Sequence, residues 1–248
     1  MSIDGDTVEP AAAASELRHL IDEATGHLLQ TAAGLSDQQA REPSLLPGWS
    51  RGHVLTHIAR NADSLRNLLI WARTGIVTPQ YADEGERDRG IAAGAGRSAP
   101  DLVSDLQGSA AALAAEADRL QPGDWAAEVR GLRGPAHPAW FTLRRRLTEV
   151  EIHHVDLNAG YGPADWPSLF AVTALERIAR DFADGETPAA RLLSPDAALE
   201  LQIGPPEAAP AVEVIGPARA MLAWLIGRSD GAGLTTAPAG QLPALPPW

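Results

Sequence analysis

Four segments in the first 160 residues carry apolar side chains at the spacing of an amphipathic helix, and this pattern constrains the fold most strongly. Ser50 and Ser98 stand at N-cap positions before two of these segments, and Gly160 follows the last of them. Four helices with connectors of this kind are typical of a helical bundle. The predicted helices run over residues 10 to about 35, 51 to about 74, 99 to about 120 and 139 to about 158.

The connectors between the predicted helices lack periodicity. Residues 75–97 carry glycine, proline and charged side chains, so we expect a long loop packed across the mouth of the bundle. Residues 121–138 form a second long connector. Loops held by a rigid scaffold often supply substrate-binding groups, and the loop over residues 75–97 is the best candidate.

The sequence changes character at the run Tyr161–Pro167, which we take as a domain boundary. Beyond it, helical and strand-like patterns alternate, separated by glycine and proline. We therefore expect an α+β protein with two domains, a helical bundle over residues 1–163 and a small domain of mixed helices and strands over residues 164–248. Its predicted elements are a helix from 168 to about 184, strands near 198–203 and 211–215, and a helix over 217–226.

Composition excludes several classes of function. The net charge is −12, and every basic residue is an arginine, so binding to duplex nucleic acid is disfavoured. The sequence has no apolar run of roughly 20 residues, and its N-terminus is acidic where a signal peptide is basic, so we expect a cytoplasmic protein without a membrane partner. With no cysteine, the chain has no disulfide and no thiolate ligand. Any thiol in its chemistry must therefore come from a small molecule.

A metal site is predicted by residues on two of the helices. Glu149 and His153 are four apart on one predicted helix, so their side chains project from the same face. His57 lies on the apolar stripe of another helix and can supply a third ligand. Two imidazoles and a carboxylate form an open zinc arrangement with a position left for water or substrate.

Simpler interpretations of these residues stay open. A Glu and a His four apart are often a solvated helix pair, and His57 alone can be a core histidine satisfied by hydrogen bonds. Two further histidines compete for the role of ligand. His53 lies one turn before His57, and His154 follows His153, but we expect both to project in other directions.

Three motifs carry a family resemblance. They are the runs LPGWSRGHVLTHIA at residues 46–59, EVEIHHVDL at 149–157 and LAWLIGR at 222–228. Together they resemble the mycothiol-dependent maleylpyruvate isomerase family, which belongs to the DinB-like metalloenzymes. The resemblance spans nearly the whole chain, because the third motif lies near its end.

The resemblance implies a fold and a ligand set. It implies a DinB-like four-helix bundle followed by a smaller domain similar to sterol-carrier-protein folds, with the active site between them. Zinc, or another divalent metal, would be held by His57, Glu149 and His153, which agrees with the helical-face argument. Arg228 would reach the site from the second domain, and Arg87 would bind an anion, with its neighbour Arg89 as the alternative.

Asp156 and Arg146 are the candidate cofactor-binding residues. Asp156 lies three residues after His153, where it can orient the imidazole or contact the bound thiol. Arg146 lies near the stripe of Glu149 and can touch a ligand, although the run 144–146 is most simply a solvated face. For Arg228, the alternative is a cation that interacts with a helix dipole.

The implied chemistry is a cis–trans isomerisation. Coordination to zinc lowers the pKa of a thiol and supplies the thiolate. The resemblance implies that the thiolate of mycothiol adds to maleylpyruvate, that the adduct rotates about the resulting single bond, and that elimination gives fumarylpyruvate. Arginines such as Arg228 and Arg87 would bind the two substrate carboxylates and the developing enolate.

Two other functions remain possible at this point. One keeps the metal and the thiol but transfers mycothiol to another electrophile. The other is a non-catalytic module with a structural metal and an apolar ligand in the C-terminal domain. In each catalytic case the expected partners are a small dicarboxylate or electrophile and a low-molecular-weight thiol, with the chain as a monomer or weak homo-oligomer.

Overall fold

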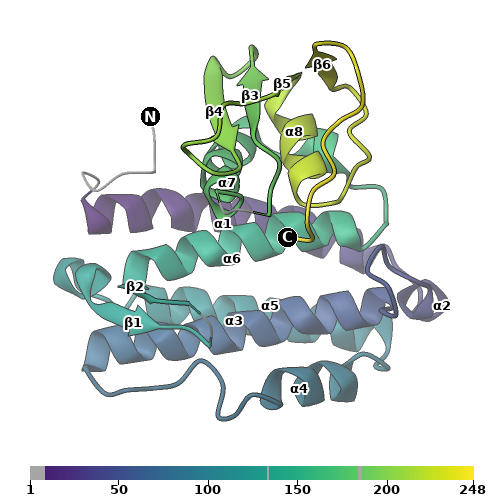
Figure 1. Cartoon of the computed structure of the whole chain (residues 1–248). Helices are drawn as coiled ribbons and strands as arrows, with labels where there is room; N and C mark the ends of the chain where they lie inside the picture. The colour runs from purple at the N-terminus through teal and green to yellow at the C-terminus, as the bar shows by residue number, and fades with distance from the viewer. Residues whose placement is uncertain (1–8, 133, 184–185) are drawn as a thin grey trace. The chain divides into compact units, whose positions relative to one another are not determined.

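The computed structural model describes residues 9–132, 134–183 and 186–248, and over these the protein is α+β. The chain divides into two compact units, of which the first ends at Tyr161 and the second runs over Gly162–Trp248. The first unit is built almost entirely of helices, and the second combines a sheet with helices (Figure 1). Among the described helices, none is both long and apolar enough to cross a membrane.

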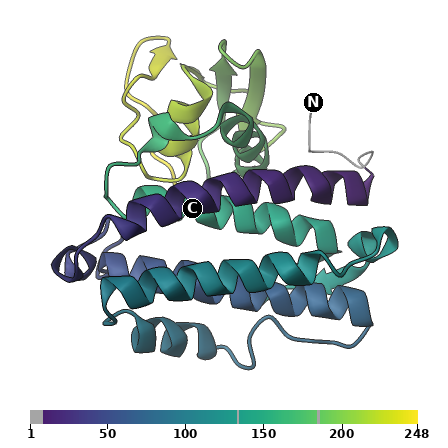
Figure 2. The ribbon, with the colours of Figure 1, turned by 180° about the vertical axis from the view of Figure 1, so that it is seen from behind.

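Long helices dominate the first unit and run side by side in both views of the ribbon (Figures 1 and 2). The helix α3 packs on α5 and α6, and α1 packs on the same two helices. A shorter helix, α4, lies against α3. The bounds are α1 Pro10–Ala33, α2 Asp37–Arg41, α3 Arg51–Thr74, α4 Glu86–Gly94, α5 Ala99–Ala117 and α6 Ala139–Asp156.

The central helix α3 follows directly from its sequence. Ser50 accepts a hydrogen bond from the backbone N–H of His53, and the His53 ring accepts one from the Ser50 N–H, so the first turn is capped at both residues. Gly75 ends the helix in the left-handed region at φ 71°. The buried stripe of α3 is formed mainly by Val54, Ile58, Leu65, Leu68 and Leu69.

One prediction for the connectors is wrong, and the second connector contains more secondary structure than its sequence indicates. Residues 75–97 are not a continuous loop, because they contain α4, and the connector at 121–138 contains a 3-10 helix, η1 (Pro122–Ala126), and two paired strands. These strands, β1 (Glu128–Arg130) and β2 (Ala136–Pro138), are antiparallel. Only Ile91 and Gly94 are buried in α4, which is too few positions to produce a helical period in the sequence.

The described part of the second unit contains a four-stranded sheet in the order β4-β3-β5-β6. Strand β3 pairs antiparallel with β4 and parallel with β5, and β5 pairs antiparallel with β6. Two helices, α7 and α8, pack on each other, and a short 3-10 helix, η2 (Pro163–Asp165), precedes them. The bounds are α7 Ser168–Asp181, β3 Ala190–Ser194, β4 Leu199–Ile203, β5 Val212–Ile215, α8 Ala218–Leu225 and β6 Thr235–Ala237.

The patterns after residue 167 predict both helices and the strands β4 and β5, but they miss β3 and β6. The buried positions of β3 are Ala190, Leu192 and Ser194, and two of these three side chains are small or polar. Alternation of apolar and polar residues is therefore weak in the strand at the centre of the sheet. The expected end of the first helix near residue 184 lies outside the described residues.

The stripe of α3 gives a stability prediction. Leu65 is fully buried, so Leu65→Ala should lower the free energy of unfolding by about 2–5 kcal/mol through lost burial and a residual cavity. Urea unfolding followed by helical circular dichroism measures this change. Leu45→Ala is the matched control, because Leu45 is 49% exposed and its truncation should change stability by less than about 0.5 kcal/mol. Equal losses in the two variants would contradict this account of the core.

Candidate metal centre

Three potential ligands from two helices meet at one point in the first unit. The Nε2 atom of His57, on α3, lies 3.0 Å from Oε2 of Glu149 and 3.1 Å from Nε2 of His153, both on α6. The Nε2 atom of His153 lies 3.2 Å from the same carboxylate oxygen. Among the described residues, this is the group of His, Cys, Asp or Glu side chains placed to hold a metal ion. The structure thus brings together the three side chains that the sequence analysis singled out.

Local structure explains why these side chains converge. Glu149 and His153 are one turn apart on α6, and His57 occupies the stripe of α3 that packs on α6. His57 is 4% exposed, and the ring of Trp49 approaches it edge-on with centroids 5.6 Å apart. The His57 and His153 rings are nearly perpendicular, with centroids 4.6 Å apart. Packing therefore holds both imidazoles in fixed orientations.

Arg51 joins the start of α3 to the end of α6. Its Nε donates to the carbonyl of Leu157 and its Nη2 to the carbonyl of Asn158, each at 2.8 Å, and its Nη1 pairs with Glu42. These carbonyls lie where α6 ends, and Asn158 adopts the left-handed conformation at φ 53° that Asn tolerates there. The arginine thus limits sliding of one ligand helix along the other.

Asp156 lies directly behind His153. Its Oδ2 atom is 2.8 Å from Nδ1 of His153, and the residue is 0% exposed. A carboxylate that accepts a hydrogen bond from Nδ1 leaves Nε2 of the same ring with its lone pair toward the cluster. This geometry supports the orienting role that was one of the two predicted for Asp156.

The cluster perturbs the pKa values of its members. Burial lowers the pKa of His57 despite the nearby Glu149 carboxylate. Burial alone would raise the pKa of Glu149, but hydrogen bonds from His153 and His57 hold it well below its usual range. Burial likewise opposes charge on His153, yet hydrogen bonds to Asp156 and Glu149 raise its pKa to about 9. Glu149 is therefore ionised near neutral pH and prefers a positively charged neighbour.

This donor set fits a divalent cation. Nε2 of His57 is the ring nitrogen that faces the cluster. The other ring nitrogen, Nδ1, is buried without a hydrogen-bond partner in the described structure. Two imidazole nitrogens at 3.1 Å can share only one proton, whereas a cation attracts both lone pairs and the carboxylate. Two histidines and one carboxylate, with no cysteine, match a zinc site that keeps a position open.

A cavity of about 390 Å³ opens onto the cluster and is lined mostly by polar side chains. Arg87 of α4 and Arg145 of α6 both line it, and the guanidinium of Arg87 lies 5.8 Å from the centre of the Trp49 ring. Arg87 also pairs with Asp88, another lining residue. Arg89 pairs with Asp83, is largely exposed and does not line the cavity, so the geometry favours Arg87 of the two candidates. Other lining residues are Asn61, Gln80, Tyr81, Glu84, Asp88 and Leu132.

Sequence reasoning missed several residues of this cavity. Arg145 belongs to the run 144–146, in which Arg146 was the residue predicted to touch a ligand. The two arginines differ only in their helical phase relative to Glu149. Gln80 and Tyr81 come from a segment without periodicity, so no pattern marks them. Burial raises the pKa of Tyr81, and its hydroxyl therefore stays protonated near neutral pH.

The interpretation of residues 144–146 as a solvated face is wrong for two of the three arginines. Arg144 is 8% exposed and stacks on Trp140, with its guanidinium 5.1 Å from the ring centre. Arg146 is 0% exposed, and its Nη1 donates to the Ile58 carbonyl at 2.7 Å and to Oδ1 of Asn61 at 2.9 Å. Arg146 does not line the cavity at the metal cluster.

Arg228 and the competing histidines make other contacts. Arg228 follows α8 in the second unit and donates from Nη1 to the carbonyl of Ile226 at 2.7 Å. His53 contacts the Ser50 hydroxyl at 2.8 Å, and His154 stacks on Tyr161 with ring centroids 3.8 Å apart. Neither histidine belongs to the cluster, as predicted. Helical direction separates His154 from His153, whereas His53, one turn before His57, is held away from the cluster by its contacts with Ser50.

Fold and site define a two-unit α+β protein whose helical unit carries a candidate His–Glu–His metal centre. The model of the mycothiol maleylpyruvate isomerase N-terminal domain matches residues 10–158, and that of the MDMPI C-terminal domain matches residues 165–247. The chain therefore belongs to the mycothiol maleylpyruvate isomerase family, as its three motifs predict.

Two solved structures are similar to the whole chain. A crystal structure of the mycothiol-dependent maleylpyruvate isomerase shares 29% identity and a TM-score of 0.86, covering 95% of this chain and 97% of that one. A mutant of that isomerase, in which a histidine is replaced by alanine, shares 28% identity and a TM-score of 0.85 with the same coverage. No curated protein matches the chain.

The geometry predicts how metal affinity depends on each residue. Asp156→Asn should weaken zinc binding about 10- to 100-fold, because His153 loses the charge that orients it. His57→Ala and Glu149→Gln should weaken it further, because each removes a ligand atom. Competition titration with a chromophoric chelator measures these affinities. His19→Gln is the control, since His19 lies exposed on α1. Unchanged zinc affinity in both ligand variants would refute the site.

Proposed function

We propose that this chain catalyses the mycothiol-dependent isomerisation of maleylpyruvate to fumarylpyruvate. The single observation that carries the proposal is the His57–Glu149–His153 cluster, which opens onto a cavity lined by two arginines. The chain belongs to a family named for this reaction, and the similar solved structures are those of a mycothiol-dependent maleylpyruvate isomerase. His57, Glu149 and His153 would hold zinc or another divalent cation.

The chemistry needs a nucleophile that adds to a conjugated double bond and then leaves. The chain contains no cysteine, so the nucleophilic sulfur has to belong to mycothiol. When bound, the cation supplies a Lewis acid that keeps a thiol deprotonated near neutral pH. Asp156 would hold the His153 ring in place throughout, and the packing of Trp49 on His57 would do the same for the second imidazole.

Arginines of the cavity would bind the substrate. Maleylpyruvate is a dianion, and a guanidinium binds a carboxylate through two parallel hydrogen bonds. Arg87 and Arg145 come from different helices and line one cavity, so each can take one negatively charged group. Tyr81, with its hydroxyl protonated, can donate a hydrogen bond to enolate oxygen as charge develops there. We retain Arg228 as a further carboxylate-binding residue on the strength of the family motif at residues 222–228.

The finer description of the fold is also a proposal. The mutual packing of α1, α3, α5 and α6 supports a DinB-like four-helix bundle, with α4 as an addition that carries Arg87. The mixed four-stranded sheet with α7 and α8 supports a domain similar to sterol-carrier-protein folds. We place the boundary between the two domains at residues 163 and 164, close to the boundary between the two compact units, which follows Tyr161.

A direct assay tests the reaction. Purified protein incubated with zinc, mycothiol and maleylpyruvate should produce fumarylpyruvate, separated by chromatography, and omission of mycothiol should abolish turnover. Chelation of the metal should do the same, with activity restored by added zinc. Glu149→Gln should lower kcat/KM by at least about 100-fold, as expected for loss of a dominant electrostatic group, while His19→Gln should not. A stable mycothiol adduct without the trans product would assign the chain as an S-transferase instead.

A paired substitution tests the substrate-binding arginine. Arg87→Gln should lower kcat/KM for maleylpyruvate about 10- to 100-fold, since a hydrogen bond to a charged group contributes about 1.5–3 kcal/mol. Arg89→Gln, two residues away, should leave kcat/KM unchanged, because Arg89 pairs with Asp83 and does not line the cavity. Steady-state kinetics at saturating mycothiol separates the two. Equal effects would move the carboxylate site away from Arg87.

A further inference from the structure

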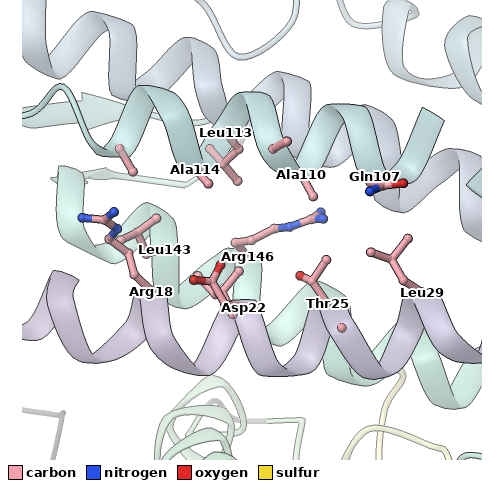
Figure 3. A pocket seen from close by; sticks show the side chains of 14 residues that line it. Arg18, Asp22, Thr25, Leu29, Gln107, Ala110, Leu113, Ala114, Leu143 and Arg146 are labelled. Carbon is pink, nitrogen blue, oxygen red and sulfur yellow. The ribbon is translucent and has the colours of Figure 1, made fainter. Parts of the chain in front are cut away.

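A second cavity lies within the helical unit, between α1 and α5, and shares no lining residue with the cavity at the metal cluster. Figure 3 shows side chains of both helices facing one another across it, with Leu143 and Arg146 of α6 also in view. Its volume is about 250 Å³. An apolar cavity of roughly 150 Å³ already admits benzene, so this one can hold a small organic molecule.

Most of the cavity wall is apolar. On α5 the wall consists largely of alanines, which leave the space between the helices open, and Ile21 and Leu29 of α1 face them. The apolar residues that line the cavity include Ile21, Leu29, Ala110, Leu113, Ala114 and Leu143. A ligand here would bury an apolar body against aliphatic side chains.

Arg146 brings an incompletely paired cation to this apolar space. Its Nη1 atom donates to Ile58 and Asn61 on α3, but its Nε and Nη2 atoms are buried and have no hydrogen-bond partner in the described structure. Oγ1 of Thr25, another residue of the cavity, is buried without a partner as well. In Figure 3 the end of the Arg146 side chain lies between Thr25 on α1 and Ala110 and Gln107 on α5.

These unpaired atoms indicate which chemical group is missing. Nε and Nη2 form the lateral edge of a guanidinium, whose two N–H bonds point in parallel and match the two oxygens of a carboxylate. Leaving buried donors of a charged group unpaired costs several kcal/mol, and a bound anion removes most of that cost. Burial lowers the pKa of Arg146 to about 10, so the side chain is still a cation at neutral pH.

The remaining charged residues limit the charge of the ligand. Arg18, at the cavity, pairs with Asp118, and Asp22 contributes a carboxylate to the lining. Arg146 would neutralise one negative charge of a dianion, and the second would be repelled by the Asp22 carboxylate. The single charge of a monoanion would be neutralised by Arg146. An uncharged ligand would leave the lateral edge of Arg146 unsatisfied.

We propose that this cavity is a binding site for a small monocarboxylic acid with an apolar body. The carboxylate pairs with Nε and Nη2 of Arg146 and accepts a hydrogen bond from the Thr25 hydroxyl. The apolar body lies along the alanines of α5. This site is distinct from the metal centre, and the inference does not depend on the isomerase reaction.

Octanoate is a suitable probe, with octan-1-ol as the neutral counterpart of the same length. Isothermal titration calorimetry with the full, zinc-loaded chain should show one octanoate site and at least tenfold weaker binding of octanol. Arg146→Met should weaken octanoate binding about 10- to 100-fold and leave octanol binding unchanged, which also shows that the cavity is intact. Equal affinities of octanoate and octanol for the unmodified chain would overturn the proposal.

Two further variants place the probe. Ala114→Phe should abolish binding of both compounds, because the ring fills the cavity while Arg146 stays in place. Arg87 does not line the cavity between α1 and α5, so Arg87→Gln should have no effect on octanoate. Arg130 is exposed on β1, so Arg130→Gln controls for the loss of one positive charge. Octanoate binding that persists in Ala114→Phe, or that is lost in Arg87→Gln or Arg130→Gln, would overturn the proposal.

Discussion

The contact between α3 and α6 is the interaction on which the rest of the helical unit depends. The helix α3 packs against α5, and α6 packs against α1, yet the surface where α3 and α6 meet carries His57, Glu149 and His153. Packing free energy from the aliphatic core therefore holds polar groups at distances that would be unfavourable in isolation. Arg51 adds a polar link between the start of α3 and the end of α6, so the pairing of the two helices is also set by directional hydrogen bonds.

The interior of this unit is more polar than its helical pattern requires. Asp156 and Arg146 are both fully buried. Along α6, Arg146 precedes Glu149 and Asp156 follows it. One reaches His153, and the other reaches α3 and the cavity between α1 and α5. Buried charges of this kind destabilise a fold unless they are paired, and Asp156 is paired with His153. The helix α6 thus contributes residues to both the candidate metal centre and the cavity between α1 and α5.

Residue patterns predicted those helices in which the spacing of side chains along the sequence matches the face that is buried in the folded chain. The stripe of α3 placed His57 inside, and the four-residue spacing on α6 placed Glu149 and His153 together, because a helix maps spacing directly onto direction. The same patterns could not reveal α4 or β3, in which few large apolar side chains are buried. They also could not choose among three consecutive arginines. Arg144, Arg145 and Arg146 differ only in helical phase, and their surroundings come from segments distant in sequence.

The weak anchoring of α4 has a consequence for how such a protein can evolve. Its core contacts are made by Ile91 and Gly94, whereas Arg87 points into the cavity beside the metal cluster. Most positions around Arg87 can therefore change without removing apolar area from the core or moving the His and Glu side chains of α3 and α6. New recognition groups for a different ligand can arise in this segment while the cluster of His57, Glu149 and His153 is inherited intact.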